Sequence, residues 1–199
     1  MPGHRRTPWW GLVSATAAPV LLVGGWTLAA TRQRGGFDPV RDTISALAAR
    51  DADDRAVMTT ALVGLGLCHL TTALALRRAA PPGRVVLAVG GAATVLVAAF
   101  PLPTGDGRSA AHTAAAGTAF VALAAWPLLA RQPGADAVLS SRGSVAAGAA
   151  LLGLVGWFFV ELVAGTGRVG LSERVAAGAQ SVWPLAVAWA TAPRGRRGR

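Results

Sequence analysis

The sequence predicts an all-α integral membrane bundle of six transmembrane helices, and three observations lead to this fold class. Of the 199 residues, 53% are hydrophobic, and the mean hydropathy is +0.47. Charged residues make up only 14%, whereas a soluble domain typically has about a quarter. Six apolar stretches approach the roughly 20 residues that a helix needs to cross a bilayer. Such continuous stretches exclude an outer-membrane barrel, whose strands alternate polar and apolar residues.

The first three predicted spans end at arginines or prolines. Span 10–31 ends before an arginine and exceeds the roughly 7–15 apolar residues of a signal peptide, so we expect an uncleaved helix. Span 56–76 ends at a pair of arginines. Span 85–102 lies between a Pro-Pro-Gly-Arg turn and a further proline, residue types that commonly flank helices.

The last three predicted spans follow the same pattern. Span 110–130 stops at an arginine. Span 143–164 carries one charge, Glu161, near one of its ends. Span 174–191 precedes an arginine-rich tail, 192–199. We therefore expect a single multi-pass membrane domain that covers the 199-residue chain, with a basic cytoplasmic tail.

The arginines predict the orientation of these spans. With the N-terminus inside, the inner segments hold eleven arginines and one acid, Asp136, so they carry the whole net charge of +10. The outer segments hold eight arginines and eight acids. This asymmetry follows the positive-inside rule, so we expect both termini in the cytoplasm and no nucleic-acid partner. Arginine without lysine, with abundant Ala and Gly, is typical of a GC-rich bacterial genome and indicates the bacterial plasma membrane.

The longest predicted loop, 32–55, lies on the outer side and contains the least uniform sequence. We expect a short extra helix in it, capped by Asp42 or Thr43. Ile44 and Leu47 would give this helix an apolar edge. Such a helix would lie along the membrane surface or tuck into the mouth of the bundle.

Polar residues from several spans converge on the same outer face. An ionisable residue at membrane depth is expensive, so each is by default a candidate site. Glu161 is the sharpest case, because inside a bundle it needs a partner such as an arginine or His112. Structural ion pairs produce the same signature, and a pair that locks two helices together is the plainer explanation. The candidate binding residues are Asp42, Ser45, His112, Glu161 and Glu173, with Arg174 as counter-charge.

The sequence offers little for metal or cofactor chemistry. Its three histidines are His4, His69 and His112, and His4 lies at the cytoplasmic terminus, so a three-histidine zinc site is not available. The lone cysteine, Cys68, cannot form an intramolecular disulfide. No phosphate-binding or dinucleotide fingerprint occurs. We therefore expect no metal and no cofactor, and we expect His69 to bond a backbone carbonyl.

An ordered set of short segments carries a family resemblance. Segment 42–47 reads Asp-Thr-Ile-Ser-Ala-Leu, 100–101 reads Phe-Pro, His112 begins the fourth span, and 170–174 reads Gly-Leu-Ser-Glu-Arg. Together they resemble the bacterial and archaeal membrane family catalogued as domain of unknown function 998. The resemblance covers nearly the whole chain and implies six helices with an outer-face cluster, but no established activity. The chain departs from the family pattern at Ala48, where a small residue such as Gly is usual.

Three function classes follow from these observations. The first is a binding or accessory protein whose outer-face cluster engages a lipid headgroup, a small ligand or a partner. The second is a lipid-modifying hydrolase that uses His112 with a carboxylate as general base. The third, a transporter or channel, is disfavoured because the inner halves of the spans are almost uniformly apolar. Small residues such as Gly91 and Gly153 favour close helix packing and are compatible with a homo-oligomer.

Overall fold

The computed structural model describes residues 6–132 and 137–193. Within these ranges the regular secondary structure is entirely helical, with no strand, so the all-α prediction is confirmed for this part of the chain. His4, Asp136 and most of the expected basic tail, from residue 194 onward, lie outside the described residues.

Six α-helices and two short 3-10 helices make up this part of the chain. Four α-helices begin earlier than the apolar runs suggest, α1 by one residue, α5 by two, α3 by four and α6 by five. In α3 the reason is local, because prolines occupy its first positions, where no N–H is needed for the helix ladder. The elements are α1 Trp9–Ala30, η2 Ser45–Ala48, α2 Ala56–Ala75, α3 Pro81–Ala99, α4 Ala110–Ala130, η3 Ala137–Leu139, α5 Ser141–Ala164 and α6 Val169–Ala190.

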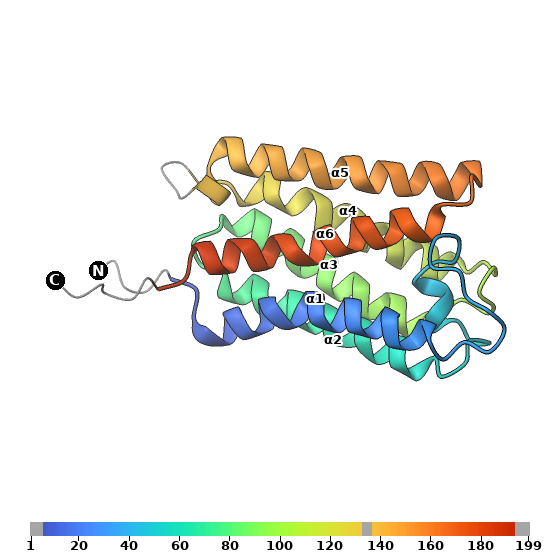
Figure 1. Ribbon diagram of the computed structural model, residues 1–199. Coiled ribbons are helices and arrows are strands. Elements are labelled where there is room, and N and C mark those ends of the chain that lie inside the picture. The colour runs from blue at the N-terminus through green and yellow to red at the C-terminus, as the bar shows by residue number, and fades with distance from the viewer. Residues whose placement is uncertain (1–5, 133–136, 194–199) are drawn as a thin grey trace.

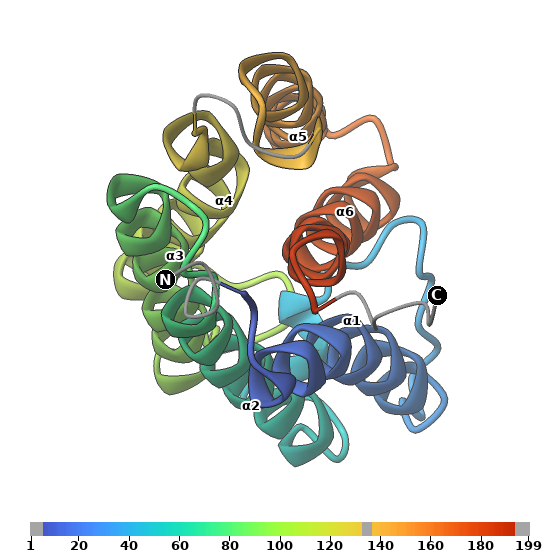
Figure 2. The same ribbon diagram turned by 90° about the vertical axis from the view of Figure 1, so that its left-hand side faces the viewer.

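The six α-helices lie roughly parallel to a common axis, and each runs in the opposite direction to the one before it (Figure 1). Each packs against the next in the chain, and α6 closes the ring by packing against α1 (Figure 2). The connections 31–55, 100–109 and 165–168 meet at one end of the bundle, which we call the loop end (Figure 1). The first turn of α1 and the last turn of α6 lie at the opposite end (Figure 1).

The surface of the bundle is apolar and part of its interior is polar. Helices α1 to α5 are each long and apolar enough to cross a membrane. Large apolar side chains face outward from the helices, among them Val20 and Leu74, each 65% exposed, and Val163, 87% exposed. Ser172 and Gln180, by contrast, are buried. An apolar exterior of this extent indicates a lipid environment.

Glycines set how closely some helices approach. A Cβ added at Gly66 of α2 would lie 2.6 Å from the carbonyl oxygen of Gly91, and one at Gly91 would lie 2.8 Å from that of Gly66. The backbones of α2 and α3 are therefore in direct contact. Gly153 of α5 differs, because an added Cβ would meet no described atom within 4 Å. The small residues thus serve packing within the bundle only where they face a neighbouring helix.

Candidate functional site

Glu173, in the first turns of α6, holds the start of η2. Its carboxylate accepts a hydrogen bond from the backbone N–H of Ile44 at 2.5 Å and lies 3.4 Å from the hydroxyl of Ser45. The Thr43 hydroxyl accepts from the N–H of Ala46 at 3.1 Å. Where the sequence predicts a short capped helix, the structure therefore has one 3-10 turn. The backbone N–H groups at its start donate to the Thr43 hydroxyl and to the Glu173 carboxylate of α6.

Arg174 fastens the same loop through its backbone. Its Nη1 donates to the carbonyl oxygens of Pro39 at 3.0 Å and Asp42 at 2.7 Å. The guanidinium also lies 5.3 Å from the centroid of the Phe37 ring and 5.9 Å from that of Trp26, within the range of a cation–π contact. The residue expected as a counter-charge therefore bonds carbonyl oxygens directly and clamps the α1–α2 connection onto α6.

Ser45 meets His112 beside this clamp. The Nδ1 atom of His112 lies 3.0 Å from the carbonyl oxygen of Phe100, and Nε2 lies 3.2 Å from Oγ of Ser45. A carbonyl oxygen only accepts, so we assign the ring proton to Nδ1. In the neutral ring, the Nε2 lone pair then faces the Ser45 hydroxyl. The position of His112 follows from its place in the first turn of α4, which is capped by Ser109.

Ser45, His112 and Glu173 form one hydrogen-bonded group, which we call the polar trio. Ser45 has a single hydroxyl proton, and both His112 Nε2 and Glu173 Oε1 lie within reach of it. It cannot donate to both at once. One additional proton, on His112 or on Glu173, would complete a continuous chain of donors across the three side chains. The trio is therefore suited to bind and pass a proton.

Two candidate residues do not join the trio. The Asp42 carboxylate accepts from the backbone N–H of Asp38 at 2.8 Å in the exposed loop. The Glu161 carboxylate accepts from the Trp157 indole at 3.1 Å and from the Thr166 hydroxyl. These bonds link Glu161 to its own helix and to the connection that follows it. The bonds to Trp157 and Thr166 stabilise the end of α5 and do not link Glu161 to His112.

An open groove of about 990 Å³ lies over the polar trio at the loop end, between α4, α5, α6 and the connections. Three of its aromatic rings pack against one another in tilted pairs, with centroids 4.8 Å apart for Phe120 and Phe158 and 5.4 Å apart for Phe158 and Phe159. The groove is thus apolar on one side and charged on the other. Its apolar wall comprises Ala116, Gly117, Phe120, Phe158, Phe159, Leu162 and Val169, and its charged rim comprises Arg41, Asp42, Asp51, Asp53, Asp106 and Arg108.

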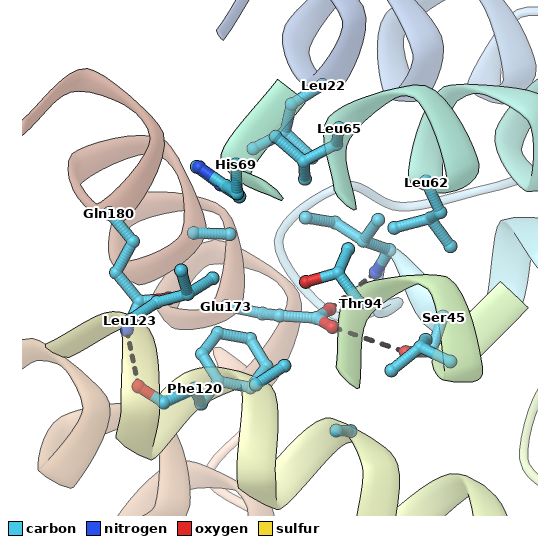
Figure 3. Close-up of a pocket in the computed structure, with 15 residues that line it drawn as sticks. Leu22, Ser45, Leu62, Leu65, His69, Thr94, Phe120, Leu123, Glu173 and Gln180 are labelled. Atoms are coloured by element: carbon cyan, nitrogen blue, oxygen red, sulfur yellow. Dashed lines mark hydrogen bonds between the residues drawn. The ribbon is translucent and has the colours of Figure 1, made fainter. Parts of the chain in front are cut away.

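A smaller cavity of about 60 Å³, which we call the chamber, extends from the trio into the bundle (Figure 3). Ser45, Phe120 and Glu173 line both the chamber and the groove. His69 also lines the chamber, and neither of its ring nitrogens has a hydrogen-bond partner among residues 6–132 and 137–193. The expectation that His69 bonds a backbone carbonyl is therefore wrong, because its ring faces the chamber instead.

The sequence analysis missed the aromatic wall and two polar residues of the chamber, Thr94 and Gln180. The Nε2 of Gln180 donates to the carbonyl oxygen of Phe120 at 2.7 Å, which ties α6 to α4 (Figure 3). An amide inside a predicted span was a usable signal, because a polar side chain there has to face the protein interior. The adjacent pair Phe158 and Phe159 gave no such signal, since aromatic residues in a span also face lipid.

The apolar exterior, the ring of helices and the polar loop end define a helical multi-pass membrane protein. The family model described as "Protein of unknown function (DUF998)" matches residues 16–190, and the chain belongs to this family. The resemblance found in the sequence is thereby confirmed. No curated protein and no solved structure matches the chain. The matched range contains all three residues of the polar trio.

Proposed function

We propose that the groove binds an amphipathic molecule, a lipid whose headgroup carries an amine. The supporting observation is that one continuous groove has an aromatic and aliphatic wall beside a charged rim. An acyl chain would lie along the wall formed by α4 and α5 and would cover apolar surface that is otherwise exposed in the groove. The headgroup would sit between the rim and the polar trio. Pockets with an apolar lining and a few polar groups are the common form of small-molecule sites.

The charges of the groove favour a cationic headgroup. Its rim holds four aspartates and two arginines, and Glu173 adds a further carboxylate at the floor. The four aspartates against two guanidiniums produce a negative potential in a cleft with low-dielectric walls, which concentrates cations, and Glu173 adds to this potential when it is ionised. An amine would be attracted there, while the arginines remain available to a phosphate on the same headgroup.

The topology that goes with this proposal has six membrane spans in one domain. Helix α6 has 22 residues, as many as α1, and its polar residues Glu173 and Gln180 are 4% and 2% exposed. Because these polar groups face the bundle, they do not oppose insertion of α6 into lipid. With the arginine asymmetry of the sequence, both termini would be cytoplasmic and the loop end would face outward in a bacterial plasma membrane.

Filling the groove is expected to remove the lipid. A Cβ added at Gly117, on the groove wall, would meet no described atom within 4 Å, so Gly117→Leu can occupy the groove without a clash at its Cβ. We expect the variant to retain amine-bearing lipid about tenfold less than the wild type, a loss of about 1.4 kcal/mol. Mass spectrometry of lipid that co-purifies in mild detergent, followed by add-back of phosphatidylethanolamine or phosphatidylglycerol, measures this.

Gly153→Leu is the matched control, since Gly153 has the same open surroundings but lies outside the groove. It should retain lipid as the wild type does. If Gly117→Leu and Gly153→Leu retain equal amounts of lipid, the lipid binds outside the groove. If the protein binds phosphatidylglycerol in preference to phosphatidylethanolamine, the charges of the groove do not select an amine.

A lipid hydrolase is the second candidate, favoured by the contact of Ser45 with His112. A hydroxyl facing the free ring nitrogen of an oriented histidine is the usual arrangement of a nucleophile and its base. The Glu173 carboxylate opposes this function, because it lies 3.4 Å from Ser45 Oγ and would repel the negative charge of a tetrahedral intermediate. Binding therefore accounts for the site better than hydrolysis does.

A fluorophosphonate probe distinguishes the two candidates, because it labels serines activated by a base. For a binding protein we expect no label on Ser45 in the wild type. Labelling that disappears in Ser45→Ala and His112→Gln, but persists in the control Ser181→Ala, would establish the hydrolase instead.

A further inference from the structure

The chamber is lined by residues of five of the six helices, and a few polar side chains interrupt its mostly apolar wall. It extends from Glu173 and Ser45 at the floor of the groove to His69 in α2 (Figure 3). Thr94 of α3 and Gln180 of α6 line it between leucine side chains. With about 60 Å³, and about 10–15 Å³ needed for each water, the chamber has room for about four water molecules.

His69 needs partners that the described protein atoms do not provide. The side chain is 1% exposed, and both ring nitrogens lack a hydrogen-bond partner within residues 6–132 and 137–193. A neutral imidazole has one donor and one acceptor, and burying both unpaired is costly. Water in the adjoining chamber would satisfy them. The hydroxyl of Thr94 donates to the carbonyl oxygen of Gly90 at 2.9 Å, so its own oxygen remains free to accept from that water.

We propose that the chamber is filled with water that connects Glu173 to His69, so that His69 is a proton-binding site reached from the loop end. In each transfer, the Glu173 carboxyl gives its proton to the adjacent water. A proton of the water chain then passes to a ring nitrogen of His69. The Glu173 carboxylate is reprotonated from the groove. The inference depends on the chamber and on His69, and does not require that the groove bind a lipid.

The chamber has one source of protons among the residues that line it. Besides His69, Glu173 is the only titratable side chain in the described lining, and His112 lies beyond it behind Ser45. Toward the opposite end of the bundle, a buried apolar cluster that includes Leu76, Leu87 and Trp126 closes the interior. The geometry therefore fits a proton store open to one side rather than a conduit through the membrane.

Histidine side-chain spectra test this proposal directly. With ¹⁵N-labelled histidine the protein has three imidazole rings with two nitrogen signals each, and His69→Gln and His112→Gln assign two of these pairs. In the wild type we expect the ring protons of His69 to exchange with solvent. Ala119→Val adds two methyl groups to a residue that lines the chamber, and it should slow this exchange at least tenfold.

Ala114→Val is the matched control, because it makes the same change on the exposed face of α4. In this variant the His69 ring protons should exchange with solvent at the wild-type rate. Equal exchange in Ala119→Val and the wild type would overturn the proposal. If Ala119→Val fails to fold, magnetisation transfer to the His69 ring of the wild-type protein tests the proposal instead. Transfer from water to the His69 ring supports the proposal, and a ring that receives it only from protein protons refutes it.

Discussion

Replacing Glu173 by alanine is expected to release the α1–α2 connection from α6. The substitution removes the acceptor of the Ile44 N–H and leaves that donor unpaired at a residue that is only 4% exposed. A buried donor that loses its partner costs about 1–3 kcal/mol. The segment around η2 should therefore open more often, and backbone hydrogen exchange at Ile44 should accelerate roughly 5- to 150-fold. Mass spectrometry of peptides covering 40–50 measures this exchange.

Glu173→Gln separates the acceptor from the charge. The glutamine retains an oxygen that can accept from Ile44, so exchange in the η2 segment should stay near the wild-type rate. Lipid retention should nevertheless fall, because the groove loses one carboxylate near the headgroup. If alanine and glutamine accelerate exchange equally, the hydrogen bond to Ile44 is not what holds the loop.

Gly170→Ala is expected to destabilise the protein because α6 and the loop touch at this glycine. An added Cβ would collide with the carbonyl oxygen of Asp42 and would lie 2.8 Å from that of Pro39. To make room, the loop would have to move away from α6. That movement would lengthen the hydrogen bond from the Leu171 N–H to the Val40 carbonyl oxygen and the hydrogen bonds that Arg174 donates to the loop. Overpacking of this kind costs typically about 1–3 kcal/mol.

Gly178→Ala makes the same change two turns further along α6 and should have the opposite sign. Its added Cβ would come no closer than 3.8 Å to the Trp26 ring, and alanine favours a helix over glycine by up to about 1 kcal/mol. Equilibrium unfolding in mixed detergent micelles compares the two variants. A Gly170→Ala protein as stable as Gly178→Ala would show that the loop does not rest on α6.

The helical architecture could be predicted because hydropathy is a property of each segment by itself. About 20 consecutive apolar residues favour a helix in lipid whatever their neighbours are, so the runs that became α1 to α5 were recognisable in the chain. Helix α6 is less apolar than the other five, and it was predicted only from residue 174 onward, in a span that contains Arg174 and Gln180. The ordered motifs likewise sufficed to recognise the family that the comparison confirms.

The composition of the site was predictable only in part. Ser45, His112 and Glu173 were among the candidate residues, and the structure brings them together. Glu161 was a candidate by the same reasoning, yet its carboxylate is satisfied within its own helix and the connection after it. The sequence assigns all of them to one end of the bundle, and depth along a helix does not distinguish a local partner from a distant one.

The sequence alone determined which segments are helical, that α1 to α5 are apolar enough for a membrane, and which polar residues share the loop end. Only the tertiary structure decided which of those residues meet. Ser45 lies 67 residues from His112 and 128 from Glu173 along the chain. Their contact depends on how far each helix is rotated about its axis, because successive side chains point about 100° apart. Helix packing sets that rotation, and the hydropathy of a single segment carries no record of it.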